Sequence, residues 1–545
     1  MTGSFKVPAI TNEEVRAYTI NSPERAALAD AIAAMKLRLP VKIPLVIGGR
    51  EITTELEASH VNPANHAEVL SKTSQASKEH VKQAIAAAAA AKDAWETTPL
   101  AARSAVFLRA AELIAGKYRY ELLAATMLGQ GKNIYQAEID AAAELIDFLK
   151  FNCQYADELA AEQPVCNAAG VWNRAEYNAL DGFVYAVTPF NFTAIAGNLV
   201  AAPALMGNTV IWKPSPYAVL SNYLLFQIFV EAGVPAGVIN FVPGDAETVT
   251  AAVLGSRDFA ALHFTGSTQV FQNLYGQIAA NLPAYRSYPR VVGETGGKNF
   301  HLIHSSADVV SAARGTVRAA FEYQGQKCSA ASRAYVPASV VEEFKSWLLT
   351  ETEQLSEGDP TESLHAFLGP VIHEGSFHKL EAVFADLRKD PAVDIIEGGT
   401  ADNARGFFVK PTVVVSADPD HYVFKREFFG PLLAIYVYDD AEFDDVVARI
   451  DADSEYALTG AVFARDRHVI ESVSSRLRHA AGNFYVNDKC TGAVVGQQWF
   501  GGSRKSGTND KAGSANILTR FVNIRNIKEN FNPTTTVLYP SNIQS

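Results

Sequence analysis

A cysteine with small neighbours lies in the segment FEYQGQKCSAAS, residues 321–332. Gly325, Ser329 and the alanines that follow leave room for a ligand to reach the thiol of Cys328. A thiolate is a strong nucleophile, and a helix that begins near a cysteine lowers the pKa of its thiol. The segment alone is compatible with a nucleophilic cysteine or a buried structural thiol, and the structural thiol is the more common case for a lone cysteine.

A glutamate stands earlier in the chain, in VVGETGGKNFHL. Glu294 lies beside a glycine pair, between two apolar runs that are typical of strands. Burial in such surroundings raises the pKa of a carboxyl group, and a raised pKa suits a general base. An isolated glutamate is also a common residue of solvated turns, so this segment alone leaves both interpretations open.

The elements that must position these residues alternate between strands and helices after Asp181. Residues 182–189 and 208–215 predict buried strands, and residues 193–207 between them predict an apolar helix. Gly182 to Trp212 contains no charged residue and is long enough to imitate a membrane span, but its prolines, asparagines and changing pattern favour buried strand–helix–strand structure. Continued alternation to about Ser506 predicts parallel strands in doubly wound sheets.

Both ends of this alternating region differ from it. Residues 78–162 have the composition and apolar spacing of helices, including an alanine-rich run. The tail FVNIRNIKENFNPTTTVLYP has strand-like stretches and no helix to cover them. Such a segment can pair with the sheet edge of another subunit.

Composition excludes several classes of partner. The 545 residues carry a net charge of -12, which argues against nucleic acid or an anionic membrane. The four cysteines contain no CxxC pair, which indicates reduced thiols and no zinc site of that kind. His301 and His304 lie three apart on a predicted strand and point to opposite faces, so we expect no metal site.

The N-terminus has no sorting signal that we recognise. Its first residues, MTGSFKVPAITNEEVRAY, lack the apolar core of a signal peptide and the arginine-rich composition of a transit peptide. This composition predicts a cytoplasmic protein, with the mitochondrial matrix as the alternative.

A phosphate-binding turn is present without the usual dinucleotide fingerprint. No GxGxxG follows a strand in the alternating region. The segment LHFTGSTQVF instead runs from a predicted strand through Gly266 and Ser267 into a predicted helix, whose first N–H groups are suited to bind phosphate. The same residues also cap ordinary helices, so the turn is a weak signal by itself.

Six segments together resemble the aldehyde dehydrogenase family: TPFNFT, IWKPS, FTGST, GETGGKNF, FEYQGQKCS and KREFFGP, in the order of the family. The resemblance extends from about Pro40 to the C-terminus. It implies an α/β fold with a Rossmann-like parallel-sheet NAD-binding domain (residues 1–161 and 183–291) and an α/β catalytic domain (292–506). Residues 162–182 and 507–545 would form a β oligomerisation arm, and the protein would be a homo-oligomer, at least a dimer.

The resemblance also implies residue roles. Cys328 would attack the aldehyde carbon, Asn191 and the cysteine N–H would stabilise the oxyanion, and Glu294 would activate water to hydrolyse the acyl thioester. NAD would be bound by Lys213, Ser215, Gly244, Gly266, Ser267 and Glu427. Two departures stand out: Pro216 replaces an acidic residue that selects against NADP, which leaves NADP open, and Phe271 replaces the second glycine of the phosphate turn.

Further segments narrow the resemblance. TMLGQGKNIYQAEIDAAAELIDFLKFN and GNFYVNDKCTGAVVGQQWFGGSRKSGTNDKAG are similar to the members of the family that oxidise L-glutamate γ-semialdehyde to glutamate in proline breakdown. The chain length implies the monofunctional form, without a fused proline dehydrogenase barrel. The substrate would contact Phe192, Ser329, Gly492, Ala493 and Phe500.

The substrate loop TGAVVGQQ is expected to be a neutral nest of N–H groups, without a local lysine or arginine cluster. Cys490, just before it, is expected to be a bystander. Two other functions remain open: an aldehyde dehydrogenase for another semialdehyde, such as succinate semialdehyde, and a catalytically silent protein on the same scaffold. The presence of Cys328, Glu294 and Asn191 argues against the second.

Overall fold

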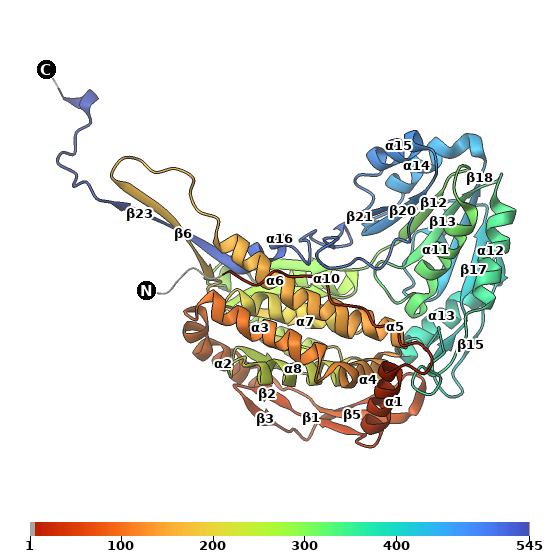
Figure 1. Cartoon of the computed structure of the whole chain (residues 1–545), viewed down its shortest axis with the longest axis horizontal. Helices are drawn as coiled ribbons and strands as arrows, with labels where there is room; N and C mark the ends of the chain where they lie inside the picture. Colours follow the sequence, from red (N-terminus) through yellow and green to blue (C-terminus); the bar gives the residue numbers. More distant parts are fainter. Residues whose placement is uncertain (1–5, 544–545) are drawn as a thin grey trace.

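The computed structural model describes residues 6–543, which form two seven-stranded sheets and a projecting arm (Figure 1). The first sheet has the order β11 (Arg290–Glu294), β10 (Phe259–Thr265), β7 (Phe183–Val187), β8 (Thr209–Lys213), β9 (Ile239–Phe241), β2 (Leu45–Ile47), β3 (Arg50–Ile52). Its first five strands are parallel, and β2 and β3 are antiparallel to their neighbours.

Helices cover both faces of this sheet. The connecting helices are α7 (Thr193–Leu205), α8 (Val219–Ala232), α9 (Ala246–Leu254) and α10 (Thr268–Ala280). Along β7, Val184 and Ala186 pack in the core that contains α7 and α8, whereas Phe183 and Tyr185 pack in the core that contains α9 and α10. Two buried faces explain why the strand sequences are continuously apolar.

The predicted strand–helix–strand unit is confirmed as β7, α7 and β8. Every residue of α7 is buried, which accounts for a charge-free segment inside a globular core. Among residues 6–543, no helix has both the length and the apolar character needed to cross a bilayer.

The helices predicted within residues 78–162 are also present. They pack with α1 (Pro23–Lys36) and are α2 (Lys78–Glu96), α3 (Leu100–Ala115), α4 (Arg119–Gln130), α5 (Ile134–Ala137) and α6 (Leu145–Ala160). Between α5 and α6 the chain forms a π-helical segment, η1 (Glu138–Glu144), which the sequence pattern did not predict. A π-helical segment turns side chains out of the α-helical spacing and is frequent at functional sites. A small sheet of β1 (Val41–Ile43), β5 (Asn65–Ser74) and β4 (Glu57–Asn62) flanks this region.

The second sheet lies across from the first (Figure 1). Its order is β14 (Val393–Glu397), β17 (Thr412–Ser416), β18 (Leu432–Tyr438), β13 (Ala331–Pro337), β12 (Asn299–Ile303), β20 (Thr459–Phe463), β21 (Asn483–Val486), and only β14 is antiparallel. Its helices are α11 (Val309–Phe321), α12 (Val341–Glu353), α13 (Glu374–Leu387), α14 (Phe443–Ala452) and α15 (Arg467–Arg476). Shorter elements include η3 (Glu322–Gly325), β15 (Ala401–Asp402), β16 (Phe408–Val409), β19 (Tyr456–Ala457), β22 (Ser503–Arg504) and α16 (Ala515–Leu518).

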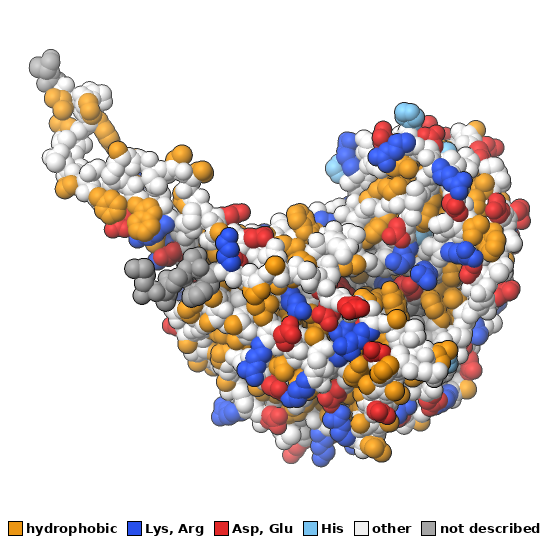
Figure 2. Space-filling view, in the orientation of Figure 1, with side chains coloured by type: hydrophobic (Ala, Val, Ile, Leu, Met, Phe, Trp, Pro, Cys, Tyr) orange, Lys and Arg blue, Asp and Glu red, His pale blue; other side chains and the backbone are white. Residues whose placement is uncertain are grey.

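A two-stranded arm projects from the body of the molecule. Strands β6 (Val171–Ala179) and β23 (Val522–Asn530) pair antiparallel along their whole length. The arm leaves large apolar side chains exposed, among them Trp172 and Ile524, and apolar residues are visible along it (Figure 2). The parallel sheets and covering helices confirm the predicted α/β class, and the residue boundaries of the domains stay a prediction.

Candidate active site

The chain before Cys328 is bent into an unusual backbone conformation. Tyr323, Gln324 and Gly325 all have left-handed φ angles of 52°, 55° and 65°. Left-handed conformations are costly for non-glycine residues and persist only where the surroundings enforce them. Here the Tyr323 hydroxyl donates to the carbonyl of Gln130 (2.8 Å), and Gln324 Nε2 donates to the carbonyl of Pro370 (2.7 Å). Contacts with distant segments therefore fix the position of the cysteine.

Cys328 is not at the N-terminus of a helix. The residue follows η3 and precedes β13. The side chain is 8% exposed, and burial, followed by the charges of Glu294 and Glu427, raises the pKa of the thiol well above its ordinary value. Burial therefore favours the neutral thiol of Cys328 over its thiolate.

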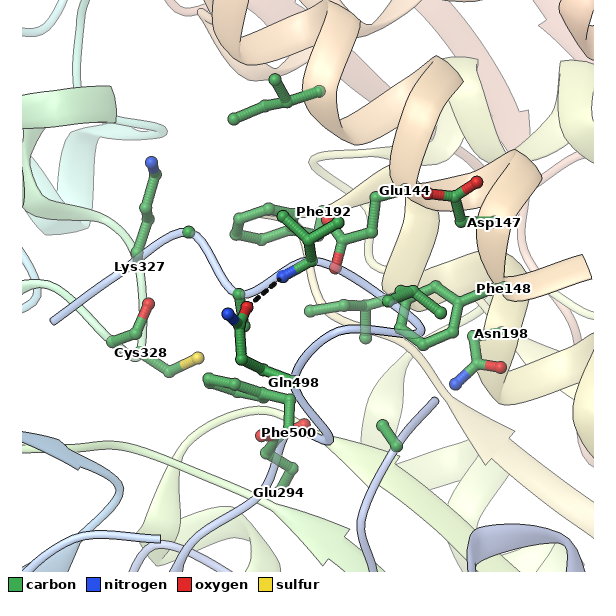
Figure 3. A pocket seen from close by; sticks show the side chains of 18 of the residues that line it. Glu144, Asp147, Phe148, Phe192, Asn198, Glu294, Lys327, Cys328, Gln498 and Phe500 are labelled. Atoms are coloured by element: carbon green, nitrogen blue, oxygen red, sulfur yellow. Dashed lines mark hydrogen bonds between the residues drawn. The ribbon is translucent and has the colours of Figure 1, made fainter. Parts of the chain in front are cut away.

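Cys328 lines a cavity of about 260 Å³ (Figure 3). The cavity lies between the two large sheets and brings together residues that are far apart in the sequence. Seven of the residues that the sequence predicted for the site line it: Phe192, Glu294, Cys328, Ser329, Gly492, Ala493 and Phe500. The structure thus gathers the proposed nucleophile, the proposed base and all five proposed substrate contacts around one space.

Glu294 is the last residue of β11. Its Oε1 atom is buried and has no hydrogen-bond partner within residues 6–543. Burial raises the pKa of this carboxyl to about 8, opposed only by the charge of Lys511. The residue as a whole is half-buried, but the buried Oε1 and the raised pKa agree with the expectation from the sequence, and this oxygen is available to accept a proton.

Asn191 lies just before α7 and is buried. Its Nδ2 atom donates to the carbonyl oxygen of Gln326 at 3.0 Å, which fixes the amide beside the peptide that leads to Cys328. An amide nitrogen carries two hydrogens, so this bond occupies one of them. Asn191 does not line the cavity itself, but it directly precedes Phe192 in the chain, and Phe192 does line the cavity.

The predicted cofactor residues lie mainly at the carboxyl ends of parallel strands. Lys213 ends β8, with Ser215 beyond it, and burial lowers the pKa of its ammonium to about 8. Gly244 follows β9, and Gly266 follows β10. Ligands of open α/β sheets bind in the crevice outside such strand ends.

Ser267 begins α10 as its N-cap, and its hydroxyl accepts from the N–H of Val270 at 3.3 Å. The first N–H groups of a helix have no partners within the helix, so α10 presents donors at the end of β10. Phe271 turns inward, stacks on Phe264 with ring centroids 5.5 Å apart and packs against Gly293. Phe271, which stands where the family resemblance predicts a glycine, therefore packs in the core beneath α10. The N-terminus of α10 still lies at the end of β10.

Glu427 lies in the segment between β17 and β18 of the second sheet and contacts the turn that follows Glu294. Its carboxylate accepts from the N–H of Gly297 at 2.8 Å. A Cβ atom at Gly296 would lie 2.1 Å from an oxygen of Glu427, so the glycine pair is what permits this approach. The proposed ribose-binding carboxylate is therefore held next to the proposed general base.

The expectation of a neutral substrate loop is wrong. Three cations line the cavity: Lys489, Arg318 and Lys327. Burial tends to raise the pKa of Glu322, but the three positive charges outweigh it and lower this pKa. Lys327 pairs with Glu322 at 3.0 Å, while Lys489 Nζ lies 3.0 Å from the place of a Cβ at Gly492. Lys489 is visible in the sequence three residues before Gly492, whereas the other two cations come from separate segments that only the fold brings together.

The sequence pattern also missed charged groups of η1. Glu144 lines the cavity, and burial, then the charge of Asp140, raises its pKa to about 8. Asp140 pairs with the fully buried Lys132 at 2.7 Å and accepts from the N–H groups of Thr193 and Ala194 at the start of α7. This buried pair fixes the helix that follows Phe192.

Two neighbours of the substrate loop have clear structural partners. Ser329 and Thr491 share a hydrogen bond of 2.7 Å between their hydroxyls. Cys490 is fully buried, and burial raises the pKa of its thiol to about 12. Cys490 is not among the residues that line the cavity, so its thiol cannot meet a substrate there, which supports the view of Cys490 as a bystander.

The fold and the site define a class of protein. Residues 52–527 match the model of the aldehyde dehydrogenase family, and the chain belongs to this family. Delta-1-pyrroline-5-carboxylate dehydrogenase, mitochondrial, from Emericella nidulans is 55% identical over 544 residues, which are 99% of this chain and 95% of that protein. A Schizosaccharomyces pombe protein, named a probable delta-1-pyrroline-5-carboxylate dehydrogenase, is 54% identical over 99% of both chains. The crystal structure of the Delta-pyrroline-5-carboxylate dehydrogenase from Mycobacterium tuberculosis bound with NAD is 47% identical, has a TM-score of 0.95 and covers 99% of each chain.

Proposed function

We propose that this enzyme oxidises L-glutamate γ-semialdehyde, the open form of Δ1-pyrroline-5-carboxylate, to L-glutamate with NAD as the oxidant. The observation that carries the proposal is one cavity that holds a cysteine, a high-pKa carboxyl and a loop bordered by cations. The cysteine and the carboxyl would act on an aldehyde group, and the loop would bind a carboxylate at the other end of the same substrate. The whole-length relatives named for this activity support the same conclusion.

Covalent catalysis begins at Cys328. Its sulfur bonds to the aldehyde carbon, and its proton passes to a carboxylate, for which the unpartnered Oε1 of Glu294 is suited. The carbonyl oxygen becomes an oxyanion that the second Nδ2 hydrogen of Asn191 and the N–H of Cys328 stabilise. Each such donor is worth about 3–4 kcal/mol in the barrier.

Glu294 acts again in the second half-reaction. After the carbon has lost its hydride, it is joined to sulfur as an acyl thioester. Once the proton taken from Cys328 has passed to solvent, Glu294 removes a proton from water, the water oxygen bonds to the acyl carbon, and the carbon–sulfur bond breaks to release glutamate and the Cys328 thiolate. One carboxyl with a pKa near neutrality can perform both proton transfers, because it gains and loses a proton at little cost.

The chain offers a suitable site for a dinucleotide. Donors at the start of α10 suit a pyrophosphate, and Lys213, Ser215 and Gly244 surround the ends of β8 and β9. Glu427 is positioned for a ribose beside Glu294. When bound, NAD supplies the hydride acceptor.

Substrate specificity would come from the residues that bind the part of the substrate remote from its aldehyde group. Ser329 and the N–H groups of Gly492 and Ala493 bind the carboxylate of the substrate, and Phe192 and Phe500 flank its aliphatic chain. Lys489 adds positive charge next to these groups. A positive charge beside the groups that bind the carboxylate favours an anionic substrate over a neutral aldehyde of the same length.

Replacing the cation tests this assignment. In Lys489→Met we expect kcat/KM for glutamate semialdehyde to fall roughly fivefold at low salt, because a nearby unscreened charge contributes on the order of 1 kcal/mol. The value for a neutral aldehyde of similar length should not change. Lys78→Met, which replaces an exposed lysine at the start of α2, is the matched control. An equal loss for both aldehydes would exclude a role of Lys489 in charge selection.

The proposed function is tested by steady-state kinetics across several ω-semialdehydes, with NAD and NADP in parallel. We expect glutamate semialdehyde to have the highest kcat/KM and succinate semialdehyde a lower one, because the second substrate lacks the α-amino group. Preference for succinate semialdehyde would establish the competing function. Pro216 stands where an acidic residue would select against NADP, so the measurement with NADP decides which cofactor the enzyme prefers.

The proposal also includes an oligomeric state and a cellular compartment. The arm of β6 and β23 leaves a two-stranded ribbon with exposed strand edges and apolar side chains, which suits pairing with a second copy as a dimer. The relative from Emericella nidulans is named mitochondrial. That name supports the mitochondrial matrix, the alternative to the cytoplasmic prediction.

A further inference from the structure

The chain before α1 crosses the active-site cavity as an extended strap, residues 6–22. Figure 1 shows this dark red segment running over the helical layer from the N-terminal side toward α1. Asn12, Glu13 and Val15 are lining residues of the cavity that contains Cys328. The strap lies outside residues 52–527, the part of the chain that matches the general family. The strap therefore adds to the cavity a wall from outside the matched part of the chain.

Asn12 uses its whole side-chain amide to join three segments. Its Nδ2 atom donates to Asp147 Oδ2 on α6 at 2.7 Å and to the carbonyl of Val495 at 2.7 Å. Its Oδ1 atom accepts from Gln497 Nε2 at 3.0 Å. Val495 and Gln497 belong to the loop that begins at Thr491 and contains Gly492 and Ala493. One side chain thus fastens this loop to α6.

The strap itself is held firmly enough to serve as an anchor. The N–H of Glu13 donates to Asp147 Oδ1 at 2.7 Å, and the Glu13 carboxylate pairs with Arg119 at 2.8 Å. Arg119 is fully buried and also donates to the carbonyl of Glu14 at 3.0 Å. The Tyr18 hydroxyl donates to Glu138 at 2.7 Å. Buried, charge-assisted bonds of this kind restrict movement.

The loop has less support of its own. Its internal bonds join Val494 to Gln498, through the side chain at 2.8 Å, which Figure 3 draws as a dashed line, and through the backbone at 2.9 Å. These bonds set the curvature of the loop but connect it to no other element. Val495 packs in the core that contains α6, and Gly496 lies against Phe151 of α6. Asn12 adds the hydrogen bonds that join the loop to α6 and so helps to set the width of the cavity.

We propose that Asn12 is a positioning residue for substrate specificity. It holds the loop at the place where the N–H groups of Gly492 and Ala493 meet the substrate carboxylate, and it does not touch the reacting carbon. This inference rests on the proposed function, because it assigns those N–H groups to the carboxylate of glutamate semialdehyde.

The test compares two aldehydes in Asn12→Ala. We expect KM for glutamate semialdehyde to rise about tenfold, since two or three hydrogen bonds that shape its site are lost, while kcat changes less than about twofold. KM for a neutral aldehyde of similar length should stay the same. Thr11→Ala, at the exposed preceding residue, is the matched control. Asn12→Asp should be worse than Asn12→Ala, because it places a carboxylate against Asp147 and a carbonyl.

Hydrogen exchange separates this inference from the proposed function. In substrate-free Asn12→Ala we expect faster amide exchange in residues 491–498, and unchanged exchange in α6 and α11. That result would support the positioning role of Asn12 even if glutamate semialdehyde proved to be a poor substrate. Unchanged exchange in the loop, or an equal KM rise for both aldehydes, would overturn it.

Discussion

Cys328→Ala should abolish NADH formation from glutamate semialdehyde, with kcat at least roughly 10⁴-fold lower, because among residues 6–543 Cys328 is the one thiol that lines the cavity and can form the thioester. The variant removes one sulfur atom from a small buried site, so the melting temperature should stay within a few degrees of the parent value. NADH binding, followed by fluorescence titration, should be retained, which shows that the loss lies in chemistry.

Two cysteines elsewhere provide matched controls. Cys166 is exposed in the segment before β6, and Cys153 is buried within α6. Cys166→Ala should have parental activity, and Cys153→Ala should lose some stability without losing the reaction. Full turnover in Cys328→Ala would refute the assignment of the nucleophile.

Glu294→Gln should slow the enzyme by roughly 10²–10⁴-fold, the usual contribution of a general base. The amide keeps the shape of the carboxyl but cannot accept the proton of water, so hydrolysis of the thioester should become the slow step. If the first half-reaction still proceeds, rapid mixing should then show a burst of NADH close to one equivalent per site. Glu342→Gln, at an exposed position of α12, is the control. An unchanged steady-state rate would remove Glu294 from the mechanism.

The same carboxyl predicts a pH dependence. Because the pKa of Glu294 is raised to about 8, the fraction of carboxylate, and with it the rate of thioester hydrolysis, should increase as the pH rises through this value. The effect on stability has the opposite sign. Between the ordinary pKa of 4.5 and about 8 the folded protein holds a proton that the unfolded chain releases, so the free energy of unfolding declines with rising pH. In Glu294→Gln this part of the decline should disappear, which denaturant titrations at several pH values can measure.

Periodic features of the sequence were sufficient to predict much of the fold. The change from strand to helix and back within residues 182–215 is set by local patterns, because both faces of these elements are buried. The grouping of Cys328, Glu294 and the substrate loop followed from segments in a known order. These predictions depend on residues that are close together in the sequence.

Features that arise from distant contacts were not predictable in this way. The left-handed turn of Tyr323 and Gln324 before Cys328 is one example, because the side chains of both residues bond to residues of other elements. The cations Arg318 and Lys489 come together only when α11 packs beside the substrate loop. The strap gave no periodic signal, since a single extended segment held by side-chain bonds has no repeat.

The walls of the cavity include Asn12 near one end of the chain and Ile517 near the other. During synthesis the N-terminal part of a protein emerges and begins to fold first. A ribosome-bound chain that has reached β13 already contains the cysteine, but it lacks the segment that completes the space around it. The reactive thiol is thus enclosed only in the finished polypeptide, and incomplete translation products should be catalytically inert.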